Sequence, residues 1–263
     1  MPNHSLHSLK IAKKERRRFA TITAYDATFA RLAEQANIEC ILVGDSLGNV
    51  IQGRRSTVPV SLDDMIYHTK AVTRGCKQPF VMTDMPFLSY GTADQAIQGA
   101  AALMQAGAQM VKMEGANWLT ETIAFMSARG IPICGHLGLL PQSVNKIGGY
   151  RYQGKDDISA RRILDDACEY EQAGADILLL ECVPAALAET VREAVEIPVI
   201  GIGAGPHTDS QVLVLQDMLG ISQRIPSFAK NFLASSSSIL EAMENYGEAV
   251  RNGTFPGSEY SLA

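Results

Sequence analysis

The amino-acid sequence predicts a single-domain α/β protein with a (β/α)₈ barrel, the TIM-barrel architecture. The chain has 263 residues, close to the roughly 250 that are typical of one such barrel. Short runs rich in Val, Ile and Leu alternate with helix-length amphipathic stretches, which is typical of parallel strands buried on both faces. Five of these runs lead directly into an acid or a histidine: Asp45, Asp84, Glu114, His136 and Glu181.

The first half of the chain is expected to hold four strand–helix units. Residues 19–24 form the first strand, and a helix to about residue 36 follows. The next three strands end at Asp45, Asp84 and Glu114. Two of the helices are expected to start at Ser61 and Thr92. Each of these residues has a side chain that is favoured at an N-cap, and an acid lies in the turn that follows. A further helix is expected over residues 117–129.

The second half completes the barrel less regularly. Strands are expected to end at residues 135–138 and at Glu181, with a helix over residues 158–173 between them and another opened by Pro184. The last two strands are residues 198–202 and 212–215, too close for a usual crossover helix. Residues 18–225 form the barrel core. Extra C-terminal helices, 228–233 and 239–251 within the segment 226–263, exceed one closing helix and are expected to pack on a neighbouring subunit.

Composition and charge limit the classes of function. The net charge of −5 gives no electrostatic support to a nucleic-acid partner. The sequence contains no run of 18 apolar residues and no apolar core of a secretory signal, so no membrane partner is expected. Five cysteines without paired metal-ligand spacing predict reduced thiols and a cytoplasmic location. The basic stretch of residues 10–18 is interpreted as a solvated helix face.

Two long loops and one glycine-rich segment stand out between the expected elements. Residues 47–59 and 139–157 are long for such loops, and long loops at a barrel mouth are often lids. Gly201, Gly203 and Gly205 resemble a dinucleotide-binding pattern, but no helix opens directly after them. We interpret these glycines as leaving room for a ligand at the mouth.

Three acids are expected to lie side by side on the rim of the barrel. Asp45, Asp84 and Glu114 end successive strands, and neighbouring strands lie about 4.8 Å apart. Carboxylates this close repel unless a cation or shared protons compensate. Mg²⁺ prefers oxygen ligands and keeps positions for water or substrate. The alternative is that each acid only caps the following helix.

Four other residues are candidates for binding and catalysis. Lys112 faces the same side as Glu114; it could neutralise a substrate carboxylate, form a Schiff base, or only order the core. His136 could bind a substrate oxygen, ligate metal, or be structural. Glu181 lies in an apolar run that could raise its pKa and suit a general base, unless it is paired with a cation. Ser46 offers a hydroxyl and an amide.

Several segments together resemble the ketopantoate hydroxymethyltransferase family. The resemblance runs from about Phe19 to the C-terminus and is carried by TITAYD (21–26), VGDSLG (43–48), DMPF (84–87), VKMEG (111–115), GHLGL (135–139) with PQS (141–143), LECVP (180–184), IGIGAG (200–205) and FAK (228–230). It implies a TIM barrel and a Mg²⁺-dependent one-carbon transfer from 5,10-methylenetetrahydrofolate to 3-methyl-2-oxobutanoate, in pantothenate biosynthesis. It also implies a large homo-oligomer, usually decameric.

The resemblance assigns roles to particular residues and leaves two departures. It implies that Asp45, Asp84 and Glu114 form the metal site, that Ser46 and Lys112 contact the keto acid, and that Glu181 accepts a proton. In this chain Arg55 stands where an acid is expected in the first long loop, and Gln216 stands where a histidine is expected before Asp217. These positions concern lid closure and subunit contacts more than the chemistry.

Two other classes of protein share the expected features. A Mg²⁺-dependent 2-oxo-acid C–C lyase of the isocitrate lyase type also has acids at strand ends. It would need a cysteine or a similar acid in the lid, and residues 47–59 contain neither. A non-catalytic barrel that serves in assembly is the second alternative. The intact set of acids with Lys112 argues against it.

Overall fold

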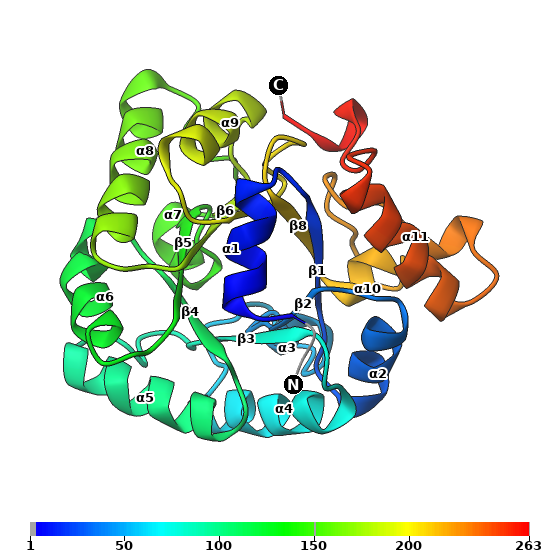
Figure 1. The fold of residues 1–263 in the computed structure, drawn as a ribbon, viewed down its shortest axis with the longest axis horizontal. Helices are drawn as coiled ribbons and strands as arrows, with labels where there is room; N and C mark the ends of the chain where they lie inside the picture. Colours follow the sequence, from blue (N-terminus) through cyan, green and yellow to red (C-terminus); the bar gives the residue numbers. More distant parts are fainter. Residues whose placement is uncertain (1–3, 150, 263) are drawn as a thin grey trace.

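Eight parallel strands close into a barrel in sequence order, which confirms the predicted fold class (Figure 1). The structure is a computed structural model that describes residues 4–149 and 151–262. The strands are β1 Phe19–Thr23, β2 Cys40–Val43, β3 Phe80–Asp84, β4 Met110–Glu114, β5 Ile133–Gly138, β6 Ile177–Glu181, β7 Val199–Ile202 and β8 Ser210–Leu213.

Helices surround the barrel and connect its strands (Figure 1). The α-helices are α1 Leu6–Lys14, α2 Ala27–Gln35, α3 Leu47–Val50, α4 Leu62–Gly75, α5 Ala93–Gln105, α6 Thr120–Ser127, α7 Val144–Ile147, α8 Asp157–Gln172, α9 Ala185–Ala194, α10 Leu215–Met218 and α11 Ile239–Arg251. The 3₁₀ turns are η1 Asn117–Leu119, η2 Pro141–Ser143, η3 Leu233–Ser235 and η4 Ser258–Tyr260. Among the described residues, no helix is long and apolar enough to cross a membrane.

The predicted helix starts at Ser61 and Thr92 are confirmed. Each side chain accepts a hydrogen bond from the backbone N–H three residues later, and each pair forms a reciprocal capping box. Such caps satisfy amide groups that have no partner within the helix. These two helix starts are predictable from the sequence alone, because the capping contact joins residues only three positions apart.

The last strand begins two residues earlier than expected. It includes the polar residues Ser210 and Gln211 and ends at Leu213, so it spans 210–213 instead of the predicted 212–215. Their burial is tolerated because both are hydrogen-bonded: Ser210 Oγ lies 2.9 Å from Thr21 Oγ1, and Gln211 Nε2 donates to Gly205 O and Thr208 Oγ1. A turn without a helix joins β7 to β8, as the short spacing indicated.

Helix α1 lies across the N-terminal end of the barrel, in front of the strands in Figure 1. The interpretation of residues 10–18 as a solvated face is wrong for its first half. Leu9 and Ala12, one turn apart, pack into the apolar interior of the barrel. Lys10 Nζ lies 2.6 Å from Asp176 Oδ1, and Lys13 Nζ donates to two backbone carbonyl groups at 2.8 and 2.9 Å.

The C-terminal segment completes the same barrel. Helix α11 matches the expected 239–251, but residues 228–233 are not an α-helix, and the turn η3 begins only at Leu233. Tyr246 of α11 donates its hydroxyl to Thr21 O at 2.7 Å and to Gln211 O at 2.9 Å. The segment therefore supplies the one helix that covers β1 and β8. That this segment also packs on a neighbouring subunit stays a prediction.

Candidate active site

The polar residues at the strand ends gather at the C-terminal mouth of the barrel. Strand register places Asp84 beside Lys112, Glu114 beside His136, and Gly138 beside Glu181. Asp45 follows the end of β2 by two residues, and its backbone N–H donates to Asp84 Oδ2 at 2.9 Å. The structure therefore brings together the predicted residues of strands 2 to 6. The side chains of Asp45, Asp84, Lys112, Glu114 and His136 are buried, whereas Ser46 and Glu181 are partly exposed.

Lys112 and Asp84 form a buried ion pair at the centre of this group. Lys112 Nζ donates to Asp84 Oδ1 at 2.5 Å. Burial by itself lowers the pKa of Lys112, but Asp84, Asp45 and Glu114 outweigh that effect and raise it. The amine is therefore protonated, and a protonated amine is not a nucleophile. The arrangement favours a charge-neutralising role over a Schiff base.

Asp45 lies in an environment that disfavours its own charge. Burial, followed by the charges of Asp84 and Glu114, raises its pKa to about 8. Four acids lie at the mouth: Asp45, Asp84, Glu114 and Glu181. The basic groups beside them are Lys112 and His136. An excess of buried negative charge is relieved by binding a cation.

His136 lies between two glutamates. Its Nδ1 is 3.2 Å from Glu114 Oε2, and its Nε2 is 3.4 Å from Glu181 Oε2. These contacts are ion pairs rather than well-aligned hydrogen bonds, because neither nitrogen has a partner with good hydrogen-bond geometry. Burial and Lys112 lower the pKa of His136, yet the two glutamates prevail and raise it. In this conformation both ring nitrogens face carboxylates.

Glu181 is the acid at the mouth that solvent and ligands reach most easily. It ends β6 with its side chain 15% exposed, compared with 3–4% for the side chains of Asp84 and Glu114. A group that exchanges a proton with a bound substrate must be accessible from the pocket. This position suits the predicted proton acceptor.

Gln142 and Tyr90 also belong to the site, although neither was predicted as a site residue. Gln142 Nε2 donates to Asp45 Oδ2 at 2.9 Å, and its backbone N–H donates to Glu114 Oε1 at 2.5 Å. Tyr90 donates its hydroxyl to Gln142 Oε1 at 2.5 Å. Gln142 therefore connects two of the predicted metal-site acids. It lies within PQS (141–143), a segment that contributed to the resemblance, whereas nothing local marked Tyr90.

Ser46 and the first long loop lie beside these acids. Ser46 follows Asp45, and its Oγ lies 2.9 Å from the hydroxyl of the buried Tyr25. The loop begins with the short helix α3, which was not expected. Arg55 is exposed in this loop. Gln216 lies in α10, and its buried Oε1 has no hydrogen-bond partner.

The carboxylates at the mouth are the candidate ligands of a divalent cation. Within the described part of the chain, no group of three or more His, Cys, Asp or Glu side chains is arranged as a metal-ligand cluster. Mg²⁺ commonly uses only one or two carboxylates, with water and substrate in the other positions. Asp45 and Asp84 fit that pattern, because they are adjacent and lie where acidic side chains outnumber basic ones. Both oxygens of Glu114 already face Gln142 and His136, which fits a contact through water.

The fold and this buried acidic site define a (β/α)₈-barrel enzyme with its chemistry at the C-terminal ends of the strands. Over residues 3–258 the chain matches the family described as ketopantoate hydroxymethyltransferase, and it belongs to that family. It is 58% identical to 3-methyl-2-oxobutanoate hydroxymethyltransferase 2 of Hahella chejuensis, with 98% of each chain covered. It is 55% identical to the 3-methyl-2-oxobutanoate hydroxymethyltransferase of Idiomarina loihiensis, over 98% of this chain and 97% of that one.

Solved structures that resemble the chain at low identity support the fold. Phosphonopyruvate hydrolase superposes with a TM-score of 0.65 at 15% identity, over 98% of this chain and 93% of that chain. A 2,3-dimethylmalate lyase, described as a member of the PEP mutase/isocitrate lyase superfamily, gives 0.58 at 16% identity over 79% and 80%. At these identities the likeness concerns the barrel and carries nothing about the reaction.

Proposed function

We propose that this protein transfers a hydroxymethyl group to 3-methyl-2-oxobutanoate, giving 2-dehydropantoate (ketopantoate) in pantothenate biosynthesis. The donor is 5,10-methylenetetrahydrofolate and the reaction depends on Mg²⁺. The observation that carries the proposal is the buried group of Asp45, Asp84 and Lys112 beside His136 and Glu181. The relatives' names, at more than half identity over nearly the whole chain, support the same reaction.

Substrate binding follows from the charges at the mouth. Asp45 and Asp84 would hold Mg²⁺, with Glu114 reaching it through water. The ion would act as a Lewis acid toward the 2-oxo acid and make its C3 proton easier to remove. Lys112, charged and buried, would neutralise the substrate carboxylate, and Ser46 would donate a hydrogen bond from its hydroxyl.

Proton removal is assigned to Glu181. Its carboxylate would take the C3 proton. One water molecule would release the methylene group of the folate as formaldehyde and leave tetrahydrofolate. C3 would then attack the carbonyl carbon of the formaldehyde, whose oxygen takes up a proton and becomes the hydroxyl of the new hydroxymethyl group. His136 Nε2, 3.4 Å from Glu181 Oε2, would hold that carboxylate in place before the keto acid binds, and would turn from it to a substrate oxygen in the complex. The loop of residues 47–59 would close over the mouth and exclude bulk water that competes for the one-carbon unit, beyond the one water molecule that supplies the hydroxyl oxygen.

The alternatives considered from the sequence have less support. A 2-oxo-acid lyase of the isocitrate lyase type shares the barrel, but the identity to the 2,3-dimethylmalate lyase structures is only 16%, and the lid has no cysteine or acid. A Schiff-base aldolase needs a neutral Lys112, which its acidic surroundings oppose. A non-catalytic barrel would have no need for a buried Lys112–Asp84 pair at the mouth.

Exchange of the substrate C3 proton in D₂O tests the assignment of the base. With Mg²⁺ and no folate, the wild-type protein should exchange this proton for deuterium. Glu181→Gln keeps the size of the side chain but removes the base, so the exchange rate should fall by roughly 10²-fold or more. Affinity for the keto acid should change little, because Lys112 and the metal-site acids remain.

Two outcomes would change the assignment. Normal exchange in the Glu181→Gln variant would move the role to His136 or to a hydroxide ion. Lost exchange in a Lys112→Ala variant that still binds Mg²⁺ and the keto acid normally would reopen the Schiff-base mechanism. A full assay from which the keto acid, Mg²⁺ and methylenetetrahydrofolate are omitted in turn tests the overall reaction, because each omission should abolish product.

We further propose a cytoplasmic homo-oligomer, as expected from the family. All five cysteines are unpaired, which fits a reducing compartment. Large apolar side chains are exposed on the single chain, among them Leu88, Ile158 and Ile221. Exposed apolar residues of this size suit burial against other subunits. A decamer is the assembly that the resemblance implies.

A further inference from the structure

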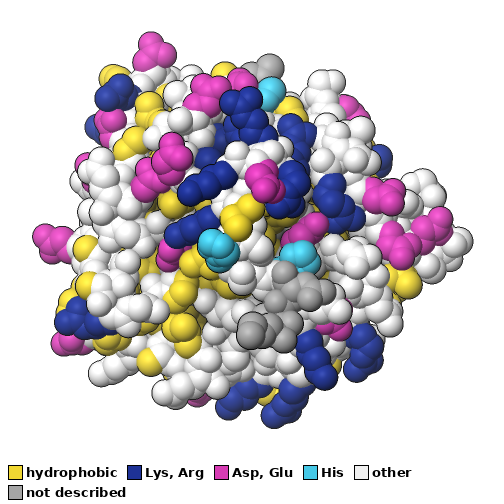
Figure 2. Space-filling view, in the orientation of Figure 1, with side chains coloured by type: hydrophobic (Ala, Val, Ile, Leu, Met, Phe, Trp, Pro, Cys, Tyr) yellow, Lys and Arg dark blue, Asp and Glu magenta, His cyan; other side chains and the backbone are white. Residues whose placement is uncertain are grey.

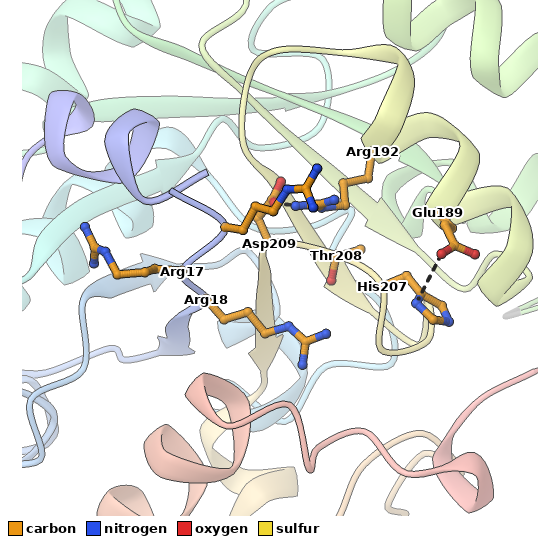
Figure 3. Close-up of a pocket in the computed structure, with 8 residues that line it drawn as sticks. Arg17, Arg18, Glu189, Arg192, His207, Thr208 and Asp209 are labelled. Atoms are coloured by element: carbon orange, nitrogen blue, oxygen red, sulfur yellow. Dashed lines mark hydrogen bonds and ion pairs between the residues drawn. The ribbon is translucent and has the colours of Figure 1, made fainter. Parts of the chain in front are cut away.

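A second polar pocket lies on the face of the barrel opposite the candidate active site. It is a hollow of about 190 Å³ between the starts of β1 and β8. Arg18 comes directly before β1, and Thr208 and Asp209 come directly before β8. Figure 3 shows Arg18 and Arg192 on either side of Thr208, with His207 farther along the same hollow. None of these residues takes part in the proposed reaction.

The surroundings of this hollow are strongly basic although the protein is acidic overall. Its lining has four arginines, Arg16, Arg17, Arg18 and Arg192, against two acids, Glu189 and Asp209. The whole chain carries −5. Figure 2 shows Lys and Arg side chains gathered on this face. A local excess of positive charge attracts anions against the field of the rest of the molecule.

Two of the arginines have no acidic partner. The buried carboxylate of Asp209 is shared by Arg192 Nε at 2.8 Å, Lys13 Nζ at 3.5 Å and a backbone N–H. Arg18 donates to the neutral carbonyl of Pro206 at 3.0 Å. The side chain of Arg16 is exposed and makes no described hydrogen bond or ion pair. The charges of Arg16 and Arg18 therefore remain available to a ligand.

The backbone at Arg16 adds a separate observation. Arg16 has a φ of +55° just after the end of α1, where its N–H donates to Lys13 O. Helices often end with a left-handed residue at this position, and glycine is preferred there because side chains are strained. This chain holds an arginine in that conformation at the rim of the hollow.

We infer that this hollow binds a phosphate-bearing anion about the size of pyrophosphate, either free or as the end of a larger molecule. Guanidinium groups recognise phosphate oxygens through paired, charge-assisted hydrogen bonds. Arg16 and Arg18 would supply these bonds, and Arg192 would add its remaining N–H groups while keeping Asp209 neutralised. The hollow is smaller than the roughly 300–1,000 Å³ of sites for drug-sized ligands, so only the anionic group would be enclosed.

Calorimetric titration of the metal-free protein with inorganic pyrophosphate tests this inference. Wild type should bind pyrophosphate, and the double variant Arg16→Gln/Arg18→Gln should bind it about tenfold more weakly or worse, because two charge-assisted contacts are lost. The control is Lys70→Gln/Arg74→Gln, which removes the same charge from the exposed surface of α4. It should bind pyrophosphate like wild type.

A third variant separates the ligand contact from folding. Arg18 contacts Pro206, so its loss could disturb the fold, whereas the Arg16 side chain has no described partner. Arg16→Gln alone should weaken pyrophosphate binding severalfold while the thermal unfolding temperature stays at the wild-type value. No binding to wild type at millimolar pyrophosphate, or equal weakening in the Lys70/Arg74 control, would overturn the inference. Weak binding that needs no particular arginine would show an adventitious charge effect only.

Discussion

Gln142 is the residue that most tightly connects the candidate site. One side chain and its own backbone amide bind two different acids, and Tyr90 fixes the orientation of the amide by donating to its oxygen. Partners of this kind orient the groups that hold a metal. Gln142 therefore acts on the reaction by positioning Asp45 and Glu114.

Replacing Gln142 should weaken metal binding rather than unfold the protein. Gln142→Ala should lower the affinity for Mg²⁺ by about 10–100-fold, as is usual when such a supporting group is lost. Activity should recover at least in part at high Mg²⁺ concentration. Gln98→Ala, on the exposed face of α5, is the control. Unchanged Mg²⁺ dependence in Gln142→Ala would show that Asp45 needs no such support.

Asp84 should be required for metal binding. Asp84→Asn keeps the size of the side chain but removes one of the two adjacent carboxylates, so Mg²⁺ binding and activity should both be lost by roughly 10²-fold or more. Asn can still accept a hydrogen bond from Lys112, which protects the fold better than alanine would. Exhaustive chelation of wild type should abolish activity and added Mg²⁺ should restore it. Full activity after chelation would exclude the metal-dependent mechanism.

At the scale of elements, α1 covers the N-terminal end of the barrel and is hydrogen-bonded to α9 and to the residues before β7. Lys13 is the main polar link, because its ammonium group donates to the carbonyl oxygens of Arg192 and Ile197 and lies 3.5 Å from Asp209. The neighbouring Lys14 is exposed and its side chain makes no described contact. The two lysines therefore form a natural comparison within one helix.

Lys13→Met should destabilise the fold and Lys14→Met should not. Loss of Lys13 leaves two carbonyl groups and a buried carboxylate with fewer donors, which costs about 1–3 kcal/mol in the free energy of unfolding. An exposed substitution such as Lys14→Met usually changes it by less than about 0.5 kcal/mol. Urea unfolding followed by circular dichroism measures both. Equal stabilities would mean that α1 contributes only apolar packing.

At the scale of the whole molecule, α11 is used within its own chain. The buried hydroxyl of Tyr246 donates to β1 and β8, and the rings of Phe232, Tyr246 and Phe255 contact one another edge to face. Subunit contacts in the proposed oligomer would use side chains outside this buried cluster. Exposed apolar side chains such as Leu88 and Ile158 are the available candidates.

The assembled protein should be much larger than one chain of 28.4 kDa. Light scattering at micromolar concentration should give a mass several times that value, close to tenfold for a decamer. Ile158→Asp, which places a charge on a side chain 70% exposed in the single chain, should reduce the mass if this residue lies in an interface. Arg161→Asp, on a neighbouring exposed position of α8, is a control for the effect of charge. A monomeric wild type would contradict the proposed assembly.

The sequence alone determined the barrel and most of the candidate site. Apolar strands that end in an acid or a histidine are a strong local signal, and the parallel topology then requires those ends to meet at one mouth. Asp45, Asp84, Lys112, Glu114, His136 and Glu181 could be placed together for that reason. Caps such as Ser61 and Thr92 were also readable, because they depend on residues three positions apart.

Only the tertiary structure decided which of these residues contact one another and what else joins them. Gln142 and Tyr90 come from loops after different strands, and their link to Asp45 depends on how those loops fold back over the mouth. The polar start of β8 was missed because its buried groups are satisfied by distant partners. The roles of Lys13 and Tyr246 depend likewise on residues more than 170 positions away. Local patterns report propensity and burial, whereas the partner of a buried polar group is set by the packing of the whole chain.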